Sequence, residues 1–73
     1  MYRPFETVRE VEKFYCKEIC YRNKIYYIVG AKIEGNSILV YLTELNSTRE
    51  VKVMSNVLLN NALCDGLPVG VKV

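Results

Sequence analysis

Cys16, Cys20 and Cys64 are the residues of this sequence that come closest to a chemical motif. A structural zinc site needs four ligands, usually cysteine or histidine at close spacing, and the chain has no histidine. A nucleophilic cysteine needs a neighbouring base or a helix N-terminus that lowers its pKa, whereas Cys64 falls at the end of a predicted helix. We therefore interpret the thiols as small buried side chains, and we predict no metal site and no cofactor.

Other catalytic chemistry is equally poorly represented. The absence of histidine excludes a serine or cysteine nucleophile that is activated by histidine within this chain. The acids of the predicted sheet are Glu18, Glu44 and Glu50. Arg49 lies across a turn from Glu44, and Thr43 neighbours Glu50, so we predict solvated cross-strand pairs. No phosphate-binding glycine motif is present. We expect no catalytic residue and a protein that is not an enzyme.

Length and composition indicate one small globular domain that spans residues 1–73. Hydrophobic residues make up 51% and charged residues 25% of the chain, which is close to the average of folded proteins. A net charge of +2 is low for a protein that binds nucleic acid through charge alone. The apolar run 38–42 is too short to cross a membrane. Three cysteines and a charged N-terminal segment without a signal sequence lead us to expect a cytoplasmic protein with reduced thiols.

The N-terminal residues predict a helix over 4–15. Its apolar residues recur at spacings of three and four and form one face: Val8, Val11, Phe14 and Tyr15. Thr7 and Glu10 have the spacing of a capping box, and Pro4 is an alternative first helical residue.

The middle of the chain changes to a period of two and predicts four strands, over 17–21, 25–33, 38–45 and 48–54. Gly35-Asn36 and Asn46-Ser47 suit two-residue hairpin turns. For the first turn we favour a three-residue loop over 22–24, because a two-residue loop would direct Glu18 into the core.

The C-terminal part predicts a helix over 56–64 and a short final strand over 69–73. Ser55 is a suitable N-cap, and Gly66 suits the residue that ends a helix. The predicted fold class is α+β and mainly β, an antiparallel meander of four strands that forms a small SH3-like barrel or a curved sheet. The alternative is an open antiparallel sheet with both helices packed on one face. The pattern does not decide whether the barrel closes.

The turns assign one face of the sheet to the core. That face comprises Ile19, Tyr21, Ile25, Tyr27, Val29, Ile33, Ile38, Val40, Leu42, Val51 and Val53. The second face is unusually apolar for a solvated surface, since it carries Cys20, Tyr26, Ile28, Leu39, Tyr41 and Met54. Three arrangements fit this face: the N-terminal helix covers it, a partner covers it, or the helix covers part of it and a partner the rest.

These patterns favour a small intracellular protein-protein interaction module, an adaptor, inhibitor or homo-oligomer of the size of many phage or mobile-element accessory proteins. It would act through this second face or through the edge of the last predicted strand, 69–73. The expected interface residues are Tyr26, Ile28, Leu39, Tyr41 and Met54. The alternative is a small nucleic-acid-binding β-barrel that presents tyrosine and lysine on its sheet surface. Its contact residues would be Lys24, Tyr26, Lys32, Tyr41 and Lys52.

Overall fold

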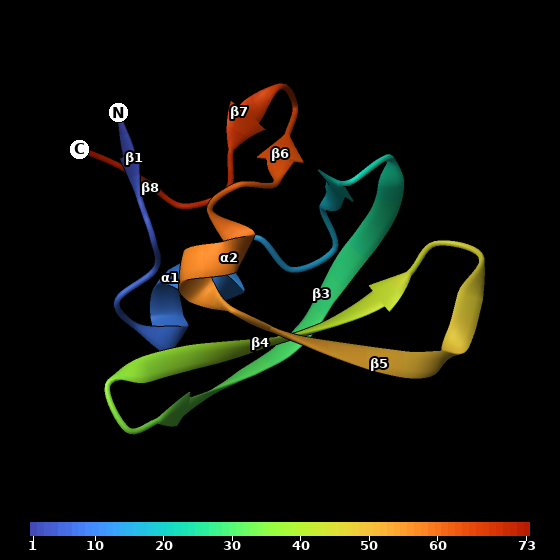
Figure 1. Cartoon of the computed structure of the whole chain (residues 1–73), viewed down its shortest axis with the longest axis horizontal. Coiled ribbons are helices and arrows are strands. Elements are labelled where there is room, and N and C mark those ends of the chain that lie inside the picture. The colour runs from blue at the N-terminus through green and yellow to red at the C-terminus, as the bar shows by residue number, and fades with distance from the viewer.

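A computed structural model describes the whole chain of 73 residues apart from the side chains of residues 47–49. Figure 1 shows the arrangement of its two helices and eight strands. In chain order the elements are β1 (Tyr2–Arg3), α1 (Val8–Glu12), β2 (Glu18–Tyr21), β3 (Lys24–Glu34), β4 (Ser37–Glu44), β5 (Ser47–Ser55), α2 (Asn56–Leu59), β6 (Leu63–Cys64), β7 (Leu67–Pro68) and β8 (Val71–Lys72).

The mainly β, antiparallel architecture predicted from the sequence is confirmed. Strands β2 to β5 begin and end within one residue of the predicted strands. The larger sheet has the order β5-β4-β3-β2-β6-β7, and β1 pairs with β8 in a separate ribbon. Because β5 and β7 lie at opposite ends of that order, the sheet is open and does not close into the predicted small barrel. Figure 1 shows α1 and α2 together on one side of the crossing strands.

Both helices are shorter than predicted. Helix α1 begins after Thr7, whose side chain accepts from the Glu10 amide in the predicted capping box, and it ends at Glu12, so residues 4–7 and 13–15 of the predicted helix are not helical. Helix α2 begins after the predicted N-cap Ser55 but ends at Leu59. Residues 63–64 form β6 instead, because Asp65 and Gly66 both adopt positive φ and turn the chain into a hairpin with β7. The predicted strand 69–73 reduces to β8.

A bulge in β3 reverses which side chains of its first half face the core. The Gly35-Asn36 turn sets Ala31 opposite Val40 and Gly30 opposite Tyr41, as predicted. The ladder then shifts between Ile28 and Gly30, so that Ile28, and not Val29, lies opposite Leu42. A bulge of this kind places an extra residue in one strand and breaks the alternation of the two faces.

The first half of β3 accordingly pairs with β2 in a register that differs from the prediction. The loop between them contains only Arg22 and Asn23, both at positive φ, and not the three residues predicted. Ile19 lies opposite Tyr26, and both are buried. The two-residue loop keeps Glu18 out of the core, because the bulge makes Tyr26 rather than Tyr27 the inward residue.

A second irregularity changes the register of β5. The ladder shifts between Thr43 and Glu44, and Val40 then lies opposite Met54, and Leu42 opposite Lys52. The predicted partners of Val40 and Leu42 were Val53 and Val51, one residue away in each case. Glu44 lies opposite Ser47, and the predicted partner Arg49 has a side chain outside the described ones. A shift of one residue moves a strand's side chains to the opposite face.

The core therefore lies between the sheet and the two helices, and it differs in part from the predicted one. The buried cluster comprises Phe5, Val11, Ile19, Tyr26, Ile28, Ile38, Val40, Leu42, Met54, Leu59, Ala62, Cys64 and Val69. Ile19, Ile38, Val40 and Leu42 were predicted as core and are buried. Val29, Ile33, Val51 and Val53 were also predicted as core but are exposed. Tyr21, Ile25 and Tyr27 are partly exposed.

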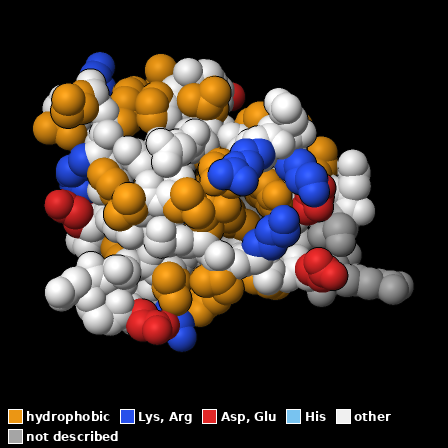
Figure 2. Space-filling view, in the orientation of Figure 1, with side chains coloured by type: hydrophobic (Ala, Val, Ile, Leu, Met, Phe, Trp, Pro, Cys, Tyr) orange, Lys and Arg blue, Asp and Glu red, His pale blue; other side chains and the backbone are white. Residues whose placement is uncertain are grey.

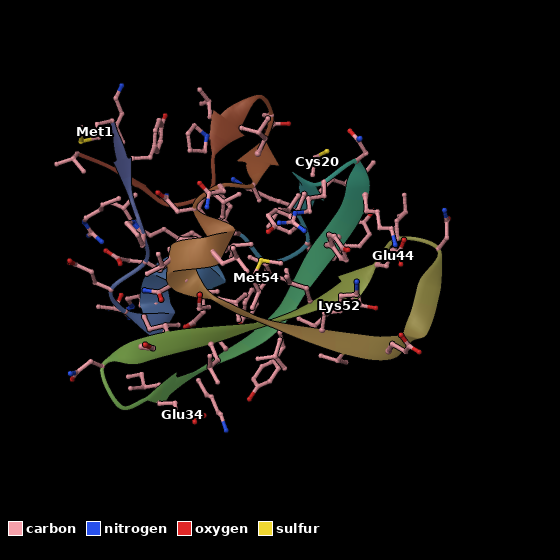
Figure 3. The ribbon with its side chains drawn as sticks, viewed as in Figure 1. Met1, Cys20, Glu34, Glu44, Lys52 and Met54 are labelled. Carbon is pink, nitrogen blue, oxygen red and sulfur yellow. The ribbon has the colours of Figure 1, made fainter. Side chains whose placement is uncertain are left out.

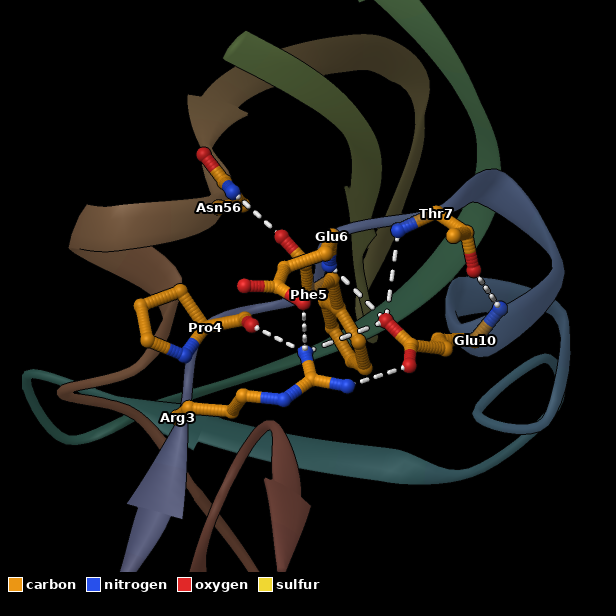
Figure 4. A network of polar contacts seen from close by, with 7 residues as sticks. All are labelled: Arg3, Pro4, Phe5, Glu6, Thr7, Glu10 and Asn56. Atoms are coloured by element: carbon orange, nitrogen blue, oxygen red, sulfur yellow. Dashed lines mark hydrogen bonds and ion pairs between the residues drawn. The ribbon is translucent and has the colours of Figure 1, made fainter. Parts of the chain in front are cut away.

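A polar network fastens the N-terminal segment to both helices, as Figure 4 shows. The Arg3 guanidinium lies 2.6 Å from the Glu10 carboxylate and also donates to the Pro4 carbonyl. Glu10 accepts from the Glu6 amide at 2.8 Å. The Asn56 side chain donates to the Phe5 carbonyl and thus ties this segment to α2. Arg3, and then the Glu6 amide, lower the pKa of Glu10 from 4.5 to about 2.

This network predicts a dependence of stability on pH. The pKa of Glu10 is lower in the folded chain, so its stabilisation is present above about pH 5 and is lost as the pH falls toward 2. We expect Glu10→Gln to lower the urea midpoint at pH 7, and the gap to the wild type to narrow steadily between pH 5 and pH 2. Glu12→Gln, on the exposed side of α1, is the matched control. A gap that stays constant with pH would contradict the role assigned to the Arg3–Glu10 pair.

Candidate interaction surface

The side of the β3-β4-β5 sheet that faces away from both helices is apolar and uncovered. Three rows of residues cross it, given by the strand register: Tyr27, Thr43 and Val51; Gly30, Tyr41 and Val53; Lys32, Leu39 and Ser55. Val29, at the bulge, adds a further exposed apolar side chain. We call Val29, Leu39, Tyr41, Val51 and Val53 the outer surface.

The exposure of the outer surface sets it apart from the core side of the same strands. Val29, Val51 and Val53 are 52%, 56% and 54% exposed, whereas Val40 and Leu42 on the opposite side are fully buried. The Tyr41 ring lies over Gly30, where an added Cβ would be 3.5 Å from Cδ2 of Tyr41. The tyrosine therefore covers the glycine of the neighbouring strand and closes a gap in the surface.

An open strand edge borders the outer surface. In the sheet order β5 has β4 as a neighbour on one side, and in the described structure no strand pairs with its other side. The strand is nine residues long, and its backbone groups on that side are available to another chain. Long, partly apolar edges of this kind favour association with an added strand.

The predicted interface residues divide between the two sides of the sheet. Leu39 and Tyr41 belong to the outer surface. Tyr26, Ile28 and Met54 are at most 8% exposed and belong to the core, so they do not form an accessible surface. Figure 3 shows Met54 on the helix side of β5. The N-terminal helix covers this part of the predicted second face, since α1 lies against β3 and its Val11 belongs to the same buried cluster as these residues.

Val29, Val51 and Val53 are the surface residues that sequence reasoning missed. The alternation of Val51 and Val53 along the strand was recognised, but the assumed register placed both in the core. Gly30 offered a signal for the bulge, because a glycine inside a strand often marks one.

The residues of the predicted nucleic-acid surface do not come together. Tyr26 and Lys52 lie on the helix side, with the Lys52 ammonium 5.5 Å from the centre of the Tyr26 ring and 3.4 Å from its hydroxyl. Lys32 and Tyr41 lie on the outer side. The Lys32 ammonium is 3.5 Å from the Glu34 carboxylate. Tyr41, and then Glu34, raise the pKa of Lys32.

Lys24, the last member of that set, lines a shallow pocket of about 200 Å³ together with Glu44 and the turn residues Asn23, Leu45 and Asn46. Figure 2 shows that the basic side chains over β3 have acidic ones beside them. The charge on the face seen in Figure 2 is therefore mixed and does not form a continuous basic groove.

No protein-family model matches the sequence, and no curated protein or solved structure matches the chain.

A groove of about 250 Å³ lies at the other end of the sheet, between β2 and the β6-β7 turn. Its lining includes Glu18, Cys20 and Asp65. Contrary to the expectation of three buried thiols, Cys20 and Cys16 are exposed, while Cys64 is buried. Burial, and then the neighbouring Asp65, raise the pKa of the Cys64 thiol, which opposes a nucleophilic thiolate there. No sequence pattern indicated this groove, because residues 63–64 were expected to be helical.

Neither a cluster of metal ligands nor a membrane-spanning helix is found among the described residues. Among them, no group of three or more cysteine, aspartate or glutamate side chains is arranged to hold a metal ion. Helices α1 and α2 span five and four residues, and no helix of the described chain has the length and apolarity to cross a membrane.

Proposed function

We propose that this protein is a small non-enzymatic interaction module that binds another protein chain through the outer surface and the adjoining edge of β5. The observation that carries the proposal is the exposure of Val29, Val51 and Val53, by 52%, 56% and 54%, on the side opposite a filled core. Both helices already pack on the core side, so no element of the described chain is left to cover these valines.

Physical arguments favour a protein over a nucleic acid as the partner. Burial of apolar surface is the main favourable contribution to protein association, and tyrosine is enriched in the centres of interfaces. Nucleic-acid binding rests on phosphate neutralisation, and the lysines available for it lie on opposite sides of this sheet. Three free thiols agree with a reduced, cytoplasmic environment, which is part of the proposal.

The test compares matched valine substitutions on two exposed sites. Val53→Lys places a charge on the outer surface, and Val57→Lys places the same charge on α2, where Val57 is 65% exposed. We expect both variants to keep the circular dichroism spectrum of the wild type. Only Val53→Lys should abolish association, measured as mass by light scattering and as partner capture from the cell that encodes the protein.

Capture is performed with nuclease and at two salt concentrations, since phosphate contacts weaken steeply with salt and apolar contacts do not. Association that survives in Val53→Lys, or that nuclease removes, would contradict the proposed function.

A further inference from the structure

The open edge of β5 fits a second copy of the same chain. The inference rests on the proposed function, because it names the partner for part of that surface. A strand edge is completed by any chain that offers a matching edge, and two copies related by a two-fold axis offer the same strand to each other in antiparallel orientation. We propose that β5 pairs with β5 of a second copy, with Val51 on the two-fold axis.

The order of charges in Glu50, Val51 and Lys52 selects this register. With Val51 opposite the partner copy's Val51, each Glu50 lies opposite a Lys52, which creates two symmetric pairs of opposite charge. Centring on Glu50 would set carboxylate against carboxylate, and centring on Lys52 would set ammonium against ammonium. Like charges directly opposite destabilise an antiparallel pair. Centring on Val53 brings no opposite charges together.

The described side chains are compatible with these contacts. Glu50 and Lys52 are exposed, and no ion pair within 4.0 Å is found for Glu50 among the described side chains. Lys52 donates to the Tyr26 hydroxyl at 3.4 Å. An ammonium group has three donors, so Lys52 can keep this bond and still bind a carboxylate on its open side. Figure 3 shows Lys52 on the helix side of β5, the side on which both charged pairs would form.

Pairing has a consequence for the outer surface. The two-fold axis through Val51 is perpendicular to the sheet, so the helices of both copies lie on one side and both outer surfaces on the other. The two Val51 side chains meet in the middle of this joined apolar surface. Stable protein interfaces bury about 800 Å² per partner, and one strand edge covers less than this. The dimer is therefore reversible and its fraction rises with concentration.

A charge-exchange experiment tests the register. We expect the wild type to form a dimer of twice 8.4 kDa in light scattering. In Glu50→Lys both pairs become ammonium against ammonium, and in Lys52→Glu both become carboxylate against carboxylate. Each variant alone should dissociate at concentrations at least about tenfold above the wild-type value. An equimolar mixture should restore the dimer, because both ammonium groups of the first variant then face carboxylates of the second.

Lys13→Glu, which changes an exposed lysine after α1, is the control and should remain a dimer. If a charge reversal disturbs folding, Glu50→Gln and Lys52→Gln replace it, with a smaller expected loss and with recovery of one of the two Glu50–Lys52 pairs on mixing. A wild type that is monomeric at all concentrations, or a mixture that stays monomeric, would overturn the proposal. If the wild type is a monomer and Val53→Lys no longer captures a partner that the wild type captures, self-pairing is refuted and the proposed function stands. If the wild type is a dimer and Val53→Lys is a dimer of the same stability, the proposed function is refuted.

Discussion

Val40→Asp is expected to unfold the protein. Val40 is fully buried between Ala31 and Met54 on the core side of the sheet. An aspartate there would carry an unpaired charge or take up a proton at a large cost, and the lost valine packing adds to this. The sum is roughly 3–5 kcal/mol or more. A chain of 73 residues has a total unfolding free energy of only about 4–11 kcal/mol.

The matched control is Val51→Asp, which places the same carboxylate on the outer surface. Val51 is 56% exposed, so the variant should keep the far-ultraviolet circular dichroism and most of the urea stability of the wild type. The register predicted from the turns placed Val51 in the core together with Val40, and from that register Val51→Asp would also be expected to unfold the protein. A folded Val40→Asp, or an unfolded Val51→Asp, would refute the observed assignment of the two faces.

The elements were predictable from sequence to the extent that local signals define them. The Thr7–Glu10 capping box, the Ser55 N-cap and the Gly35-Asn36 turn are formed by residues close in the chain, and all three are present. The predicted helix 56–64 is too long because Leu63 pairs with Cys20 of β2, a residue far away in the sequence. Tertiary contacts of this kind override local preference.

The assignment of the two faces failed for a different reason. In β3 both alternating sets of residues are apolar or aromatic, since Tyr26 and Ile28 are as suited to a core as Tyr27 and Val29. The pattern therefore could not show where one face gives way to the other. Packing against α1 and α2 resolves the ambiguity by burying Tyr26 and Ile28. The bulge at Val29 supplies the extra residue that lets the two halves of β3 turn different sets of side chains toward the core. The prediction of the candidate surface was wrong for the same reason, because its three exposed valines, Val29, Val51 and Val53, were assigned to the core.

Gly70→Ala is expected to cause the second large loss of stability. Gly70 is buried where the C-terminal segment passes the N-terminal one, beside the pairing of β1 with β8. A Cβ at this position would overlap the carbonyl oxygen of Arg3 and would lie 2.7 Å from Nδ2 of Asn60. The first of these atoms is backbone and cannot rotate away. The second belongs to an amide that donates to the Val69 carbonyl at 2.8 Å.

To relieve the overlap, β8 would have to move away from β1. This movement would also disturb Arg3 and its contact with Glu10. We expect a loss of about 3 kcal/mol, which at this chain length lowers the melting temperature by roughly 4–8 °C per kcal/mol. Gly66→Ala is the control, because it replaces a glycine that has no close contact. The difference in melting temperature between the two variants therefore measures the effect of the contact at Gly70. Gly66 has φ of +81° with open space around it, so backbone strain alone should cost roughly 1–2 kcal/mol. Equal melting temperatures for the two variants would mean that the segments carrying Gly70 and Arg3 do not pack as closely as the structure has them.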